Sequence, residues 1–429
     1  MRTRRIGVVV PFLFEGIGGV PEVADFLVRT IERTSGFDYA LVSLAMAATD
    51  ADSVRLLEPR TWCTGVRVSD GSWRGRAFRH VGARWVEVEF QRYRPRRALA
   101  RELSACDLIQ VVGGSPAWAL TVCGLGKPVA VQCATRARFE RRRGEAIARG
   151  PKALWRRAMT HITDRLEQRA LRRVDAVQVE NPWMFDHVVT LNRGRNAIVR
   201  LAPPGIDITQ FRPRDERERR AGPYILCVGR LDDPRKNIEL LLQAYALLPR
   251  AVREATQLVL AGSAGPLPSF WRRAENIGLR ERISFVTNLS REALVALYQG
   301  ASVFALPSDE EGLGLALLEA MACGVPAVST RSGGPDGIIE DGRDGYLVPR
   351  DDAVALAERV TRLLCDPALS LAMGERARET LIRRYAVDVA GSAFVDVWTF
   401  CARLPPSTNS SESMVVLRAR RFHESAQYG

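Results

Sequence analysis

Strand-length apolar runs alternate with helix-period segments along most of this chain, and this alternation constrains the fold most strongly. The first run, residues 6–14, leads into the glycines of 16–19 and then into apolar positions at helical spacing. A second unit of the same kind begins at residues 224–229 and continues into a helix over 237–248. Further strands are expected at 40–46, 108–112, 129–133, 175–179, 257–261, 282–286, 303–306 and 325–329. Such alternation predicts an α/β fold with parallel, doubly wound sheets.

The 429 residues are enough for two or three domains. We expect two tandem doubly wound, Rossmann-like domains that face each other across a cleft, over residues 1–205 and 206–385. Residues 202–213 are proline-rich and lack periodicity, which is typical of a linker. A helix over 386–404 closes the fold and could pack back on the N-terminal domain, and 405–429 is expected to be a mobile tail. Ligands of such sheets bind beyond the carboxyl ends of the strands.

The positive charge is concentrated in the first half of the chain. Residues 1–200 hold 34 Lys and Arg against 20 Asp and Glu, a net charge of +14, whereas the remainder carries −1. Residues 136–173 alone hold 13 basic and 4 acidic side chains. The same segment contains Trp155 and a predicted amphipathic helix over 153–173. This segment predicts either a solvated helix face or a surface for an anionic partner, such as phospholipid headgroups or a lipid-linked acceptor. No nucleic-acid-binding module accompanies the arginines, so nucleic acid is not an expected partner.

Nothing in the sequence indicates a membrane span, a secreted protein or a metal site. The longest charge-free stretch, 109–126, is interrupted by Gly113, Gly114 and Pro116, and no signal-peptide pattern opens the chain. The eight cysteines form no C-x-x-C pair and are expected to be reduced core residues of a cytoplasmic protein. Asp50-Ala51-Asp52 is a D-x-D sequence, which we interpret as a solvated loop. Any membrane contact would then be peripheral, at the inner face.

Residues 308–326 are the most informative stretch for function. Glu311 lies in the loop after a strand, and Glu319 follows with seven residues between them, in a helix that starts at about Gly314. Gly312 and Gly314 leave the backbone N–H groups at the helix start uncovered, where they can bind anions or hydroxyl oxygens. The plain structural interpretation is a helix start with two incidental acids.

A second group of polar residues follows the first strand of the same domain. Gly229, Arg230 and Lys236 lie between this strand and the next helix. A bidentate guanidinium and a compact ammonium placed in this way suit a diphosphate. Each cation alone would be read as a surface residue, but the two occur in one domain with the Glu311–Glu319 segment.

Together these motifs resemble the family 4 glycosyltransferases, which are retaining enzymes of the GT-B fold. The resemblance is nearly continuous from about residue 170 to 385 and includes VDAVQVENP, PPGIDITQFRP, VGRL with RKN, LVLAGSAGP, SDEEGLGLALLEAMACGVPAV and GGPDGIIEDGRDGYLVP, with GIGGV near the start. It implies that residues 1–205 form the acceptor side and 206–385 bind the nucleotide sugar.

The resemblance also implies roles for individual residues. Arg230 and Lys236 would neutralise the donor diphosphate, and Glu319 would bind the ribose. Glu311 and the N–H groups of Gly312, Leu313 and Gly314 would hold the sugar hydroxyls. The expected catalytic residues are Arg230, Lys236 and Glu311; the expected donor-binding residues are these three with Gly18, Gly19, Gly229, Gly312, Leu313, Gly314 and Glu319.

The chain departs from the family pattern at two positions. Many relatives carry a histidine after the strand that matches 129–133, where this chain has Ala134, and none of its four histidines is in register. Asp336 stands where relatives often have Glu.

The expected function is therefore metal-independent, retaining transfer of a hexose-type sugar. The donor would be a UDP- or GDP-sugar and the acceptor a hydroxyl, in the assembly of a cell-surface polysaccharide or glycolipid, with no cofactor. Two alternatives stay open: glycosylation of a small secondary metabolite, and a catalytically silent subunit that only binds sugar nucleotides.

Overall fold

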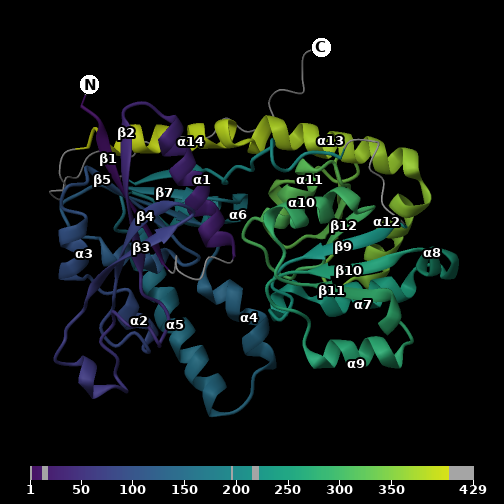
Figure 1. Cartoon of the computed structure of the whole chain (residues 1–429), viewed down its shortest axis with the longest axis horizontal. Coiled ribbons are helices and arrows are strands. Elements are labelled where there is room, and N and C mark those ends of the chain that lie inside the picture. The colour runs from purple at the N-terminus through teal and green to yellow at the C-terminus, as the bar shows by residue number, and fades with distance from the viewer. Residues whose placement is uncertain (1, 12–17, 195–196, 215–221, 405–429) are drawn as a thin grey trace. The chain divides into compact units, whose positions relative to one another are not determined.

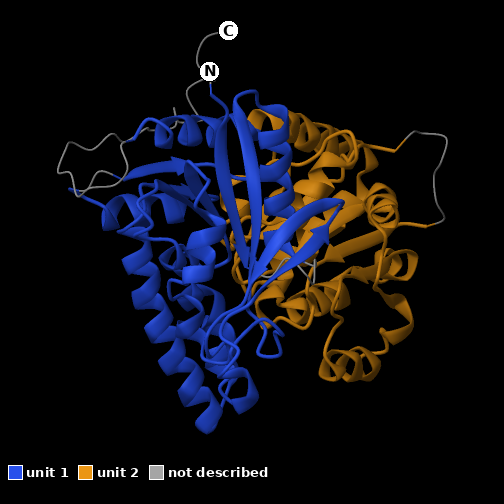
Figure 2. Ribbon diagram, turned by 60° about the vertical axis from the view of Figure 1, so that its left-hand side comes forward, with its two compact units in different colours: residues 1–204, 390–429 blue, residues 205–389 orange. Residues whose placement is uncertain are grey.

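The computed structural model describes residues 2–11, 18–194, 197–214 and 222–404 (Figure 1). It divides into two compact units (Figure 2). Unit 1 comprises residues 1–204 and 390–429, and unit 2 comprises 205–389. The predicted strand at 6–14 is described only as far as Pro11; its last three residues, and the first two of the predicted glycine turn at 16–19, lie outside the described residues.

Unit 1 is built on an eight-stranded sheet in the order β3-β4-β2-β1-β5-β6-β7-β8. All neighbouring pairs are parallel except β3 with β4. The strands are β1 (Arg4–Pro11), β2 (Phe37–Leu44), β3 (Val68–Trp73), β4 (Arg76–Val81), β5 (Leu108–Val112), β6 (Val129–Cys133), β7 (Ala176–Val179) and β8 (Ile198–Leu201). The helices are α1 (Gly19–Arg33), α2 (Glu89–Arg92), α3 (Arg97–Glu102), α4 (Ala137–Ile147), α5 (Pro151–Leu171) and α6 (Pro182–Leu191). The central strands are fully buried, as expected for a parallel sheet covered on both faces.

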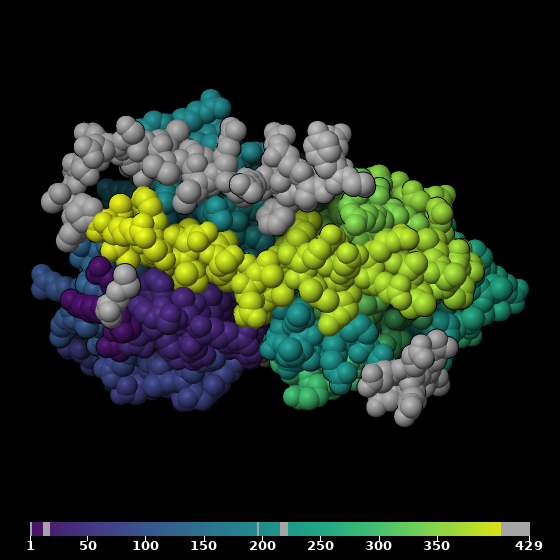
Figure 3. All heavy atoms as spheres, turned by 90° about the horizontal axis from the view of Figure 1, so that it is seen from above, coloured from purple at the N-terminus to yellow at the C-terminus, as the bar shows by residue number. Residues whose placement is uncertain are grey.

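Helix α14 (Val387–Cys401) belongs to unit 1 from Ala390 onward, although it follows unit 2 in the chain. The indole N–H of Trp398 donates to the side-chain oxygen of Gln110 on β5, at 2.7 Å. Phe394 packs edge-on against Phe26 of α1, with ring centroids 5.3 Å apart, and α14 and α1 lie side by side in Figure 3. A polar residue in the middle of β5 is thereby satisfied by an aromatic donor more than 280 residues away.

Unit 2 is built on a six-stranded parallel sheet in the order β11-β10-β9-β12-β13-β14. The strands are β9 (Tyr224–Val228), β10 (Gln257–Ala261), β11 (Ile283–Val286), β12 (Val303–Leu306), β13 (Ala327–Thr330) and β14 (Tyr346–Val348). The helices are α7 (Ile238–Leu247), α8 (Arg250–Ala255), α9 (Pro268–Asn276), α10 (Arg291–Gly300), α11 (Leu315–Ala322), α12 (Ala353–Cys365) and α13 (Pro367–Tyr385). Strand order reverses between β9 and β12. Ligands of doubly wound sheets bind at such a switch point, beyond the carboxyl ends of the strands.

The interpretation of residues 202–213 as a linker is wrong from Gly205 onward. These residues lack helix and strand, as predicted, but from Gly205 they are part of unit 2. Ile206 forms a backbone bridge with Ala386, and Phe211 is buried against Tyr298. The apolar side chains within this proline-rich stretch complete a hydrophobic core, which is why the chain follows the surface of unit 2 here.

Two smaller interpretations also need correction. Asp50 is not solvated, because its carboxylate contacts the buried His80 Nε2 at 2.6 Å and accepts hydrogen bonds from Ser53 and the backbone of Asp52. The D-x-D sequence therefore anchors a loop to β4. All eight cysteines have free thiols, but Cys63 and Cys365 are exposed and not core residues.

Over the described part of the chain, no helix is both long enough and apolar enough to cross a membrane.

Candidate functional site

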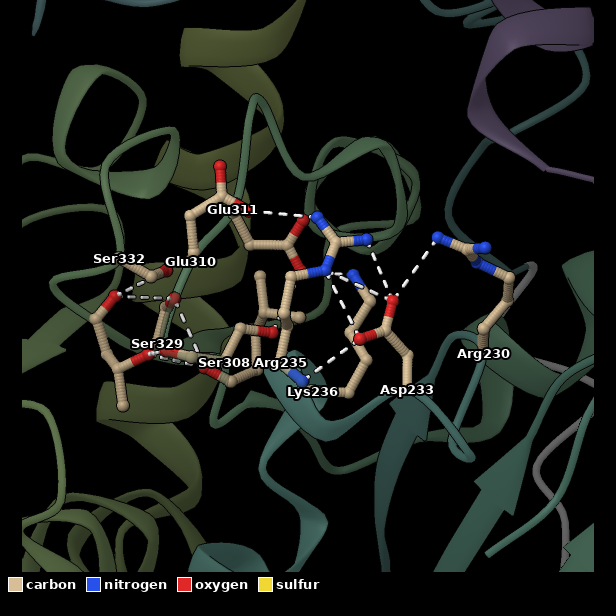
Figure 4. A network of polar contacts seen from close by, with 11 residues as sticks. Arg230, Asp233, Arg235, Lys236, Ser308, Glu310, Glu311, Ser329 and Ser332 are labelled. Carbon is tan, nitrogen blue, oxygen red and sulfur yellow. Dashed lines mark hydrogen bonds and ion pairs between the residues drawn. The ribbon is translucent and has the colours of Figure 1, made fainter. Parts of the chain in front are cut away.

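Three loops meet at the switch point of unit 2. They follow β9, β12 and β13, and they carry residues 229–237, 307–314 and 331–337. Figure 4 shows the polar contacts that connect them. The loop after β12 is tied to the loop after β13 by two backbone hydrogen bonds of 2.9 Å, from Glu311 N to Ser332 O and from Gly334 N to Glu311 O. The position of Glu311 is therefore set by main chain on both sides.

Lys236 and Glu311 form an ion pair at the centre of this site. Lys236 ends the short 3₁₀ turn Pro234–Lys236, and its ammonium contacts Oε1 of the Glu311 carboxylate. The hydroxyl of Ser308 donates to the same oxygen at 2.8 Å. Both charged side chains are largely shielded, with 17% and 10% exposure. The fold thus places one of the chain's three lysines beside a fixed carboxylate that is 75 positions away in the sequence.

Arg235 joins the first two loops, and sequence reasoning did not single it out. Its guanidinium donates to Asp233 at 2.8 Å and to Glu310 at 2.9 Å, while its carbonyl accepts from the backbone N–H of Asp309 (Figure 4). Burial alone would raise the pKa of Asp233, but hydrogen bonds and charge from Arg235 hold that pKa below its usual value. Arg235 thus fixes Asp233 and Glu310, which precede Lys236 and Glu311 in their loops.

Arg230 is in a more open position than Lys236. Its side chain is 53% exposed and has an ion pair of 3.3 Å with Asp233. The preceding Gly229 donates its N–H to Ala261 at 2.9 Å. A Cβ on Gly262 would lie 1.8 Å from the carbonyl oxygen of Gly229, so only glycine fits at position 262. This close contact holds the start of the Arg230 loop against the carboxyl end of β10.

Helix α11 begins directly after the glycines of the β12 loop. Gly314 is its N-cap residue and has a left-handed φ of 98° that favours glycine. The side chain of Leu313 is buried in the core, and the carbonyl of the same residue lies so close to Gly334 that a Cβ there would be 2.3 Å away. Gly312 is half-buried on the same loop. The predicted helix start is therefore observed within one residue.

Glu319 lies in the second turn of α11, where it accepts a hydrogen bond of 2.7 Å from the hydroxyl of Tyr298 on α10. Tyr298 is fully buried; burial, and then the charge of Glu319, raise the pKa of its phenol well above the usual value. Tyr298 orients one carboxylate oxygen of Glu319.

The N-terminal glycines are in unit 1. Gly18 is the N-cap residue of α1 with a φ of 123°, and Gly19 begins that helix. Both are exposed, at the carboxyl side of β1.

The carboxyl edge of the unit 1 sheet carries its own polar cluster after β6. The carbonyl of Ala134, at about the place of the missing histidine, accepts from the side-chain amide of Asn181 at 2.7 Å. Arg136 pairs with Asp164 and lies 2.7 Å from Nε2 of His187 on α6. Burial and then the charge of Arg136 lower the pKa of His187. No histidine is in register in the sequence, yet the fold brings His187 to this loop.

Glu180 also lies at this edge of the sheet, directly after β7. It is buried and accepts a hydrogen bond from the side chain of Gln132 on β6. Burial raises its pKa to about 7, which the single hydrogen bond from Gln132 only partly opposes. A carboxyl group that titrates near neutral pH therefore lies where ligands of an α/β sheet bind.

Asp336 follows β13 and has a local structural role. Its carboxylate accepts from the backbone N–H of Gly333 at 2.7 Å. Across the described residues, no cluster of three or more His, Cys, Asp or Glu side chains has the arrangement of a metal site.

Solved structures share the two-unit fold. Sucrose-phosphate synthase from Thermosynechococcus elongatus superposes with a TM-score of 0.67, covering 92% of this chain and 98% of its own at 21% identity. HepE from Anabaena, solved with UDP and glucose, superposes with a TM-score of 0.66 at 14% identity. The superposition covers 92% of this chain and 100% of the HepE chain. At these identities the likeness shows the fold alone, which is the GT-B fold of glycosyltransferases and confirms the predicted fold class.

The second comparison is with protein-family models. A model of "Glycosyl transferases group 1" matches residues 209–380, which are most of unit 2. The resemblance to family 4 is thereby confirmed.

Curated relatives are similar over about half of the chain. One is the GDP-mannose-dependent alpha-(1-6)-phosphatidylinositol monomannoside mannosyltransferase of Mycolicibacterium smegmatis, 34% identical over 219 residues, which are 48% of this chain and 57% of the relative. Another is the D-inositol 3-phosphate glycosyltransferase of Corynebacterium jeikeium, which is 32% identical over 227 residues. These are 49% of this chain and 54% of the relative. The chain thus spans little more than half the length of the curated relatives that it matches.

Proposed function

We propose that this protein transfers a hexose-type sugar from a UDP- or GDP-sugar to a hydroxyl acceptor with retention of configuration. The observation that carries the proposal is the Lys236–Glu311 pair at the switch point of a group 1 glycosyltransferase domain. A cation and a carboxylate held side by side suit a ligand that is anionic at one end and carries hydroxyl groups at the other. A nucleoside diphosphate sugar has this chemistry.

Within this proposal, Lys236 and Arg230 neutralise the diphosphate, which accumulates charge as the sugar leaves. Glu311 and the N–H groups around Gly312, Leu313 and Gly314 bind sugar hydroxyls, and Glu319 binds the ribose. Gly18 and Gly19 would contribute from unit 1. Stabilising developing charge with fixed donors is the largest contribution in many transferases.

We also propose that no divalent metal is needed. The neutralising charge would come from Lys236 and Arg230 together with the N-terminus of α11. These groups are already fixed by the chain, through Glu311 and Asp233 respectively. Replacing a metal ion by protein cations requires that they be held in place, which these contacts achieve.

The proposed acceptor is an anionic hydroxyl compound, and a phosphate-bearing glycolipid at the inner face of a membrane fits best. Residues 1–200 carry a net charge of +14, which favours an anionic acceptor on the side of unit 1. The names of the curated relatives mention phosphatidylinositol monomannoside and D-inositol 3-phosphate. The second name favours a small soluble acceptor, so this alternative stays in the test below.

Titration calorimetry with UDP-, GDP-, ADP- and dTDP-sugars tests the donor. We expect one or two of these to bind the parent protein, and Lys236→Met to weaken them strongly. Arg250→Met is the matched control, because this arginine lies on α8 and its side chain is 84% exposed. Binding of none of the four donors would contradict the proposal. Donor binding without hydrolysis or transfer to any acceptor would instead indicate a catalytically silent subunit.

Acceptor class is tested separately with the donor found in this way. Transfer to phosphate-bearing glycolipids in vesicles supports the glycolipid acceptor. Transfer only to water-soluble hydroxyl compounds would support glycosylation of a small metabolite.

A further inference from the structure

Three large apolar side chains are exposed where α4 and α5 meet. Ile147 is the last residue of α4, and Leu154 and Trp155 lie in the first turns of α5; their exposures are 65%, 66% and 60%. The two helices extend away from the sheet of unit 1 and end in this turn, at the lower edge of Figure 1, and Figure 2 shows unit 1 with the same projection. Transfer of such exposed apolar side chains from water into an apolar phase lowers the free energy.

The charged side chains of the turn itself, from Ile147 to Arg157, are all positive. Between Glu145 and Asp164 the chain has no acidic residue. It has four cations in this stretch, all exposed: Arg149, Lys152, Arg156 and Arg157. An apolar centre flanked by cations with flexible stems is the pattern of segments that lie in a membrane interface, where the charged ends reach the lipid phosphates.

Hydrogen bonds to α2 and between α4 and α5 hold this turn in place. Arg141 donates to both carboxylate oxygens of Glu89, at 3.0 and 2.6 Å. Glu145 accepts from Thr160 on α5 at 2.5 Å, and its carbonyl accepts from Arg157 at 2.8 Å. These bonds fix α4 to α2 and to α5, so the exposed side chains need no rearrangement to meet a partner.

The same contacts narrow the surface that the sequence predicted. Of the arginine run 141–143, Arg141 is bound to Glu89 and is not available to an anionic partner. The second half of α5 is packed on unit 1 along one face, with Thr163, Asp164 and Glu167 buried. Exposed arginines also lie elsewhere in this segment, at 138, 142, 165, 169, 172 and 173, but its three most exposed large apolar side chains all lie within residues 147–157, beside four exposed cations.

We propose that residues 147–157, the α4–α5 turn, dock unit 1 onto a bilayer that contains anionic phospholipids. Ile147, Leu154 and Trp155 enter the interface, and the four surrounding cations contact phosphate groups. A bilayer accounts for both features: a polyanion such as RNA would use the cations without requiring the apolar side chains, and a second copy of the chain would bring like charges together.

Docking at this turn has a consequence for the acceptor, which rests on the proposed function. Helix α4 begins at Ala137, four residues after β6 ends at Cys133. The turn is thus connected by one rigid helix to the carboxyl edge of the unit 1 sheet. A lipid-linked acceptor in the same bilayer would lie within reach of that edge.

Co-sedimentation of the full chain with vesicles tests the docking. The vesicles contain either phosphatidylcholine alone or an equal mixture with phosphatidylglycerol. We expect binding to the anionic vesicles only, and loss of most of it at 1 M salt, where the Debye length falls to about 3 Å. Leu154→Ser with Trp155→Ser, and separately Lys152→Gln with Arg156→Gln, should each weaken binding at least tenfold.

Leu371→Ser is the matched control, because Leu371 on α13 of unit 2 has the same 66% exposure as Leu154. It should bind vesicles like the parent, and all variants should keep the parent's melting temperature and nucleotide affinity. Equal binding to neutral vesicles, no binding to anionic vesicles, or parent-like binding by both double variants would overturn the proposal. Salt-sensitive RNA binding, or a dimer in sedimentation equilibrium that the same variants abolish, would assign the surface to those partners instead. Nucleotide binding by unit 2 is measured independently, so a failed docking test leaves the proposed transfer reaction standing.

Discussion

Lys236 should contribute far more than Arg230 to binding of a nucleoside diphosphate, although the sequence presents them as equivalent cations. The difference lies in their surroundings, since the Lys236 side chain is 17% exposed and the Arg230 side chain 53%. Two unit charges 4 Å apart interact by roughly 4 kcal/mol at an effective dielectric constant of about 20, and by about 1 kcal/mol in water. After partial losses to desolvation, Lys236→Met should cost about 2–4 kcal/mol, which is a roughly 30- to 1000-fold weaker Kd. Arg230→Met should cost about 1 kcal/mol or less.

The measurement is titration calorimetry with the nucleoside diphosphate and with the free nucleoside. Loss of Lys236 also leaves Glu311 without its cation, so Glu311→Gln and the double variant complete a cycle that separates the two effects. The Arg230 effect should shrink at 0.5 M salt more than the Lys236 effect, because exposed charges are screened more strongly. Equal losses for nucleoside and diphosphate, or a larger loss from Arg230→Met, would refute this assignment.

Three further outcomes are expected. Arg235→Met removes the cation that Asp233 and Glu310 share and should lower unfolding free energy by about 2–4 kcal/mol in urea titrations, whereas Arg250→Met should leave it almost unchanged. Because the folded pKa of Asp233 is depressed, its share of this stability is present above the unfolded pKa and should vanish as pH falls through the folded one; a loss that persists in acid contradicts the ion-pair explanation. Burial raises the folded pKa of Glu180 to about 7, against 4.5 in the unfolded chain, so ionising this group lowers the unfolding free energy by roughly 3 kcal/mol as pH rises from about 5 to 7. Glu180→Gln should remove this fall in stability. An unchanged pH dependence would show that Glu180 titrates normally. Donor binding and transfer should survive EDTA, and a strict requirement for Mg²⁺ or Mn²⁺ would disprove charge neutralisation by Lys236 and Arg230.

The alternation of strands and helices was predictable because each period is local, and so were the loops that follow β9 and β12. Lys236 and Glu311 could be grouped from sequence since parallel strands bring their carboxyl ends to one edge of a sheet. The partners that orient these residues were not predictable. Arg235 looks like one more surface arginine until the fold places it between Asp233 and Glu310. Tyr298 reads as a core residue of α10, and nothing local indicates that its hydroxyl meets Glu319.

The net charge of the first 200 residues likewise could not predict where in unit 1 the basic surface lies. An excess of +14 over residues 1–200 predicts a basic surface but does not locate it, because burial removes many arginines from solvent. Arg96 donates to three backbone carbonyls, and burial lowers its pKa to about 10. Arg76 is held by Asp25 and Glu32, and Arg136 by Asp164. In the α4–α5 pair, the chain between Glu145 and Asp164 has no carboxylate and its four cations are exposed, and Leu154 and Trp155 are exposed in the same stretch. The informative quantity is therefore the local absence of acid, which the sequence contains but the sum of charges conceals.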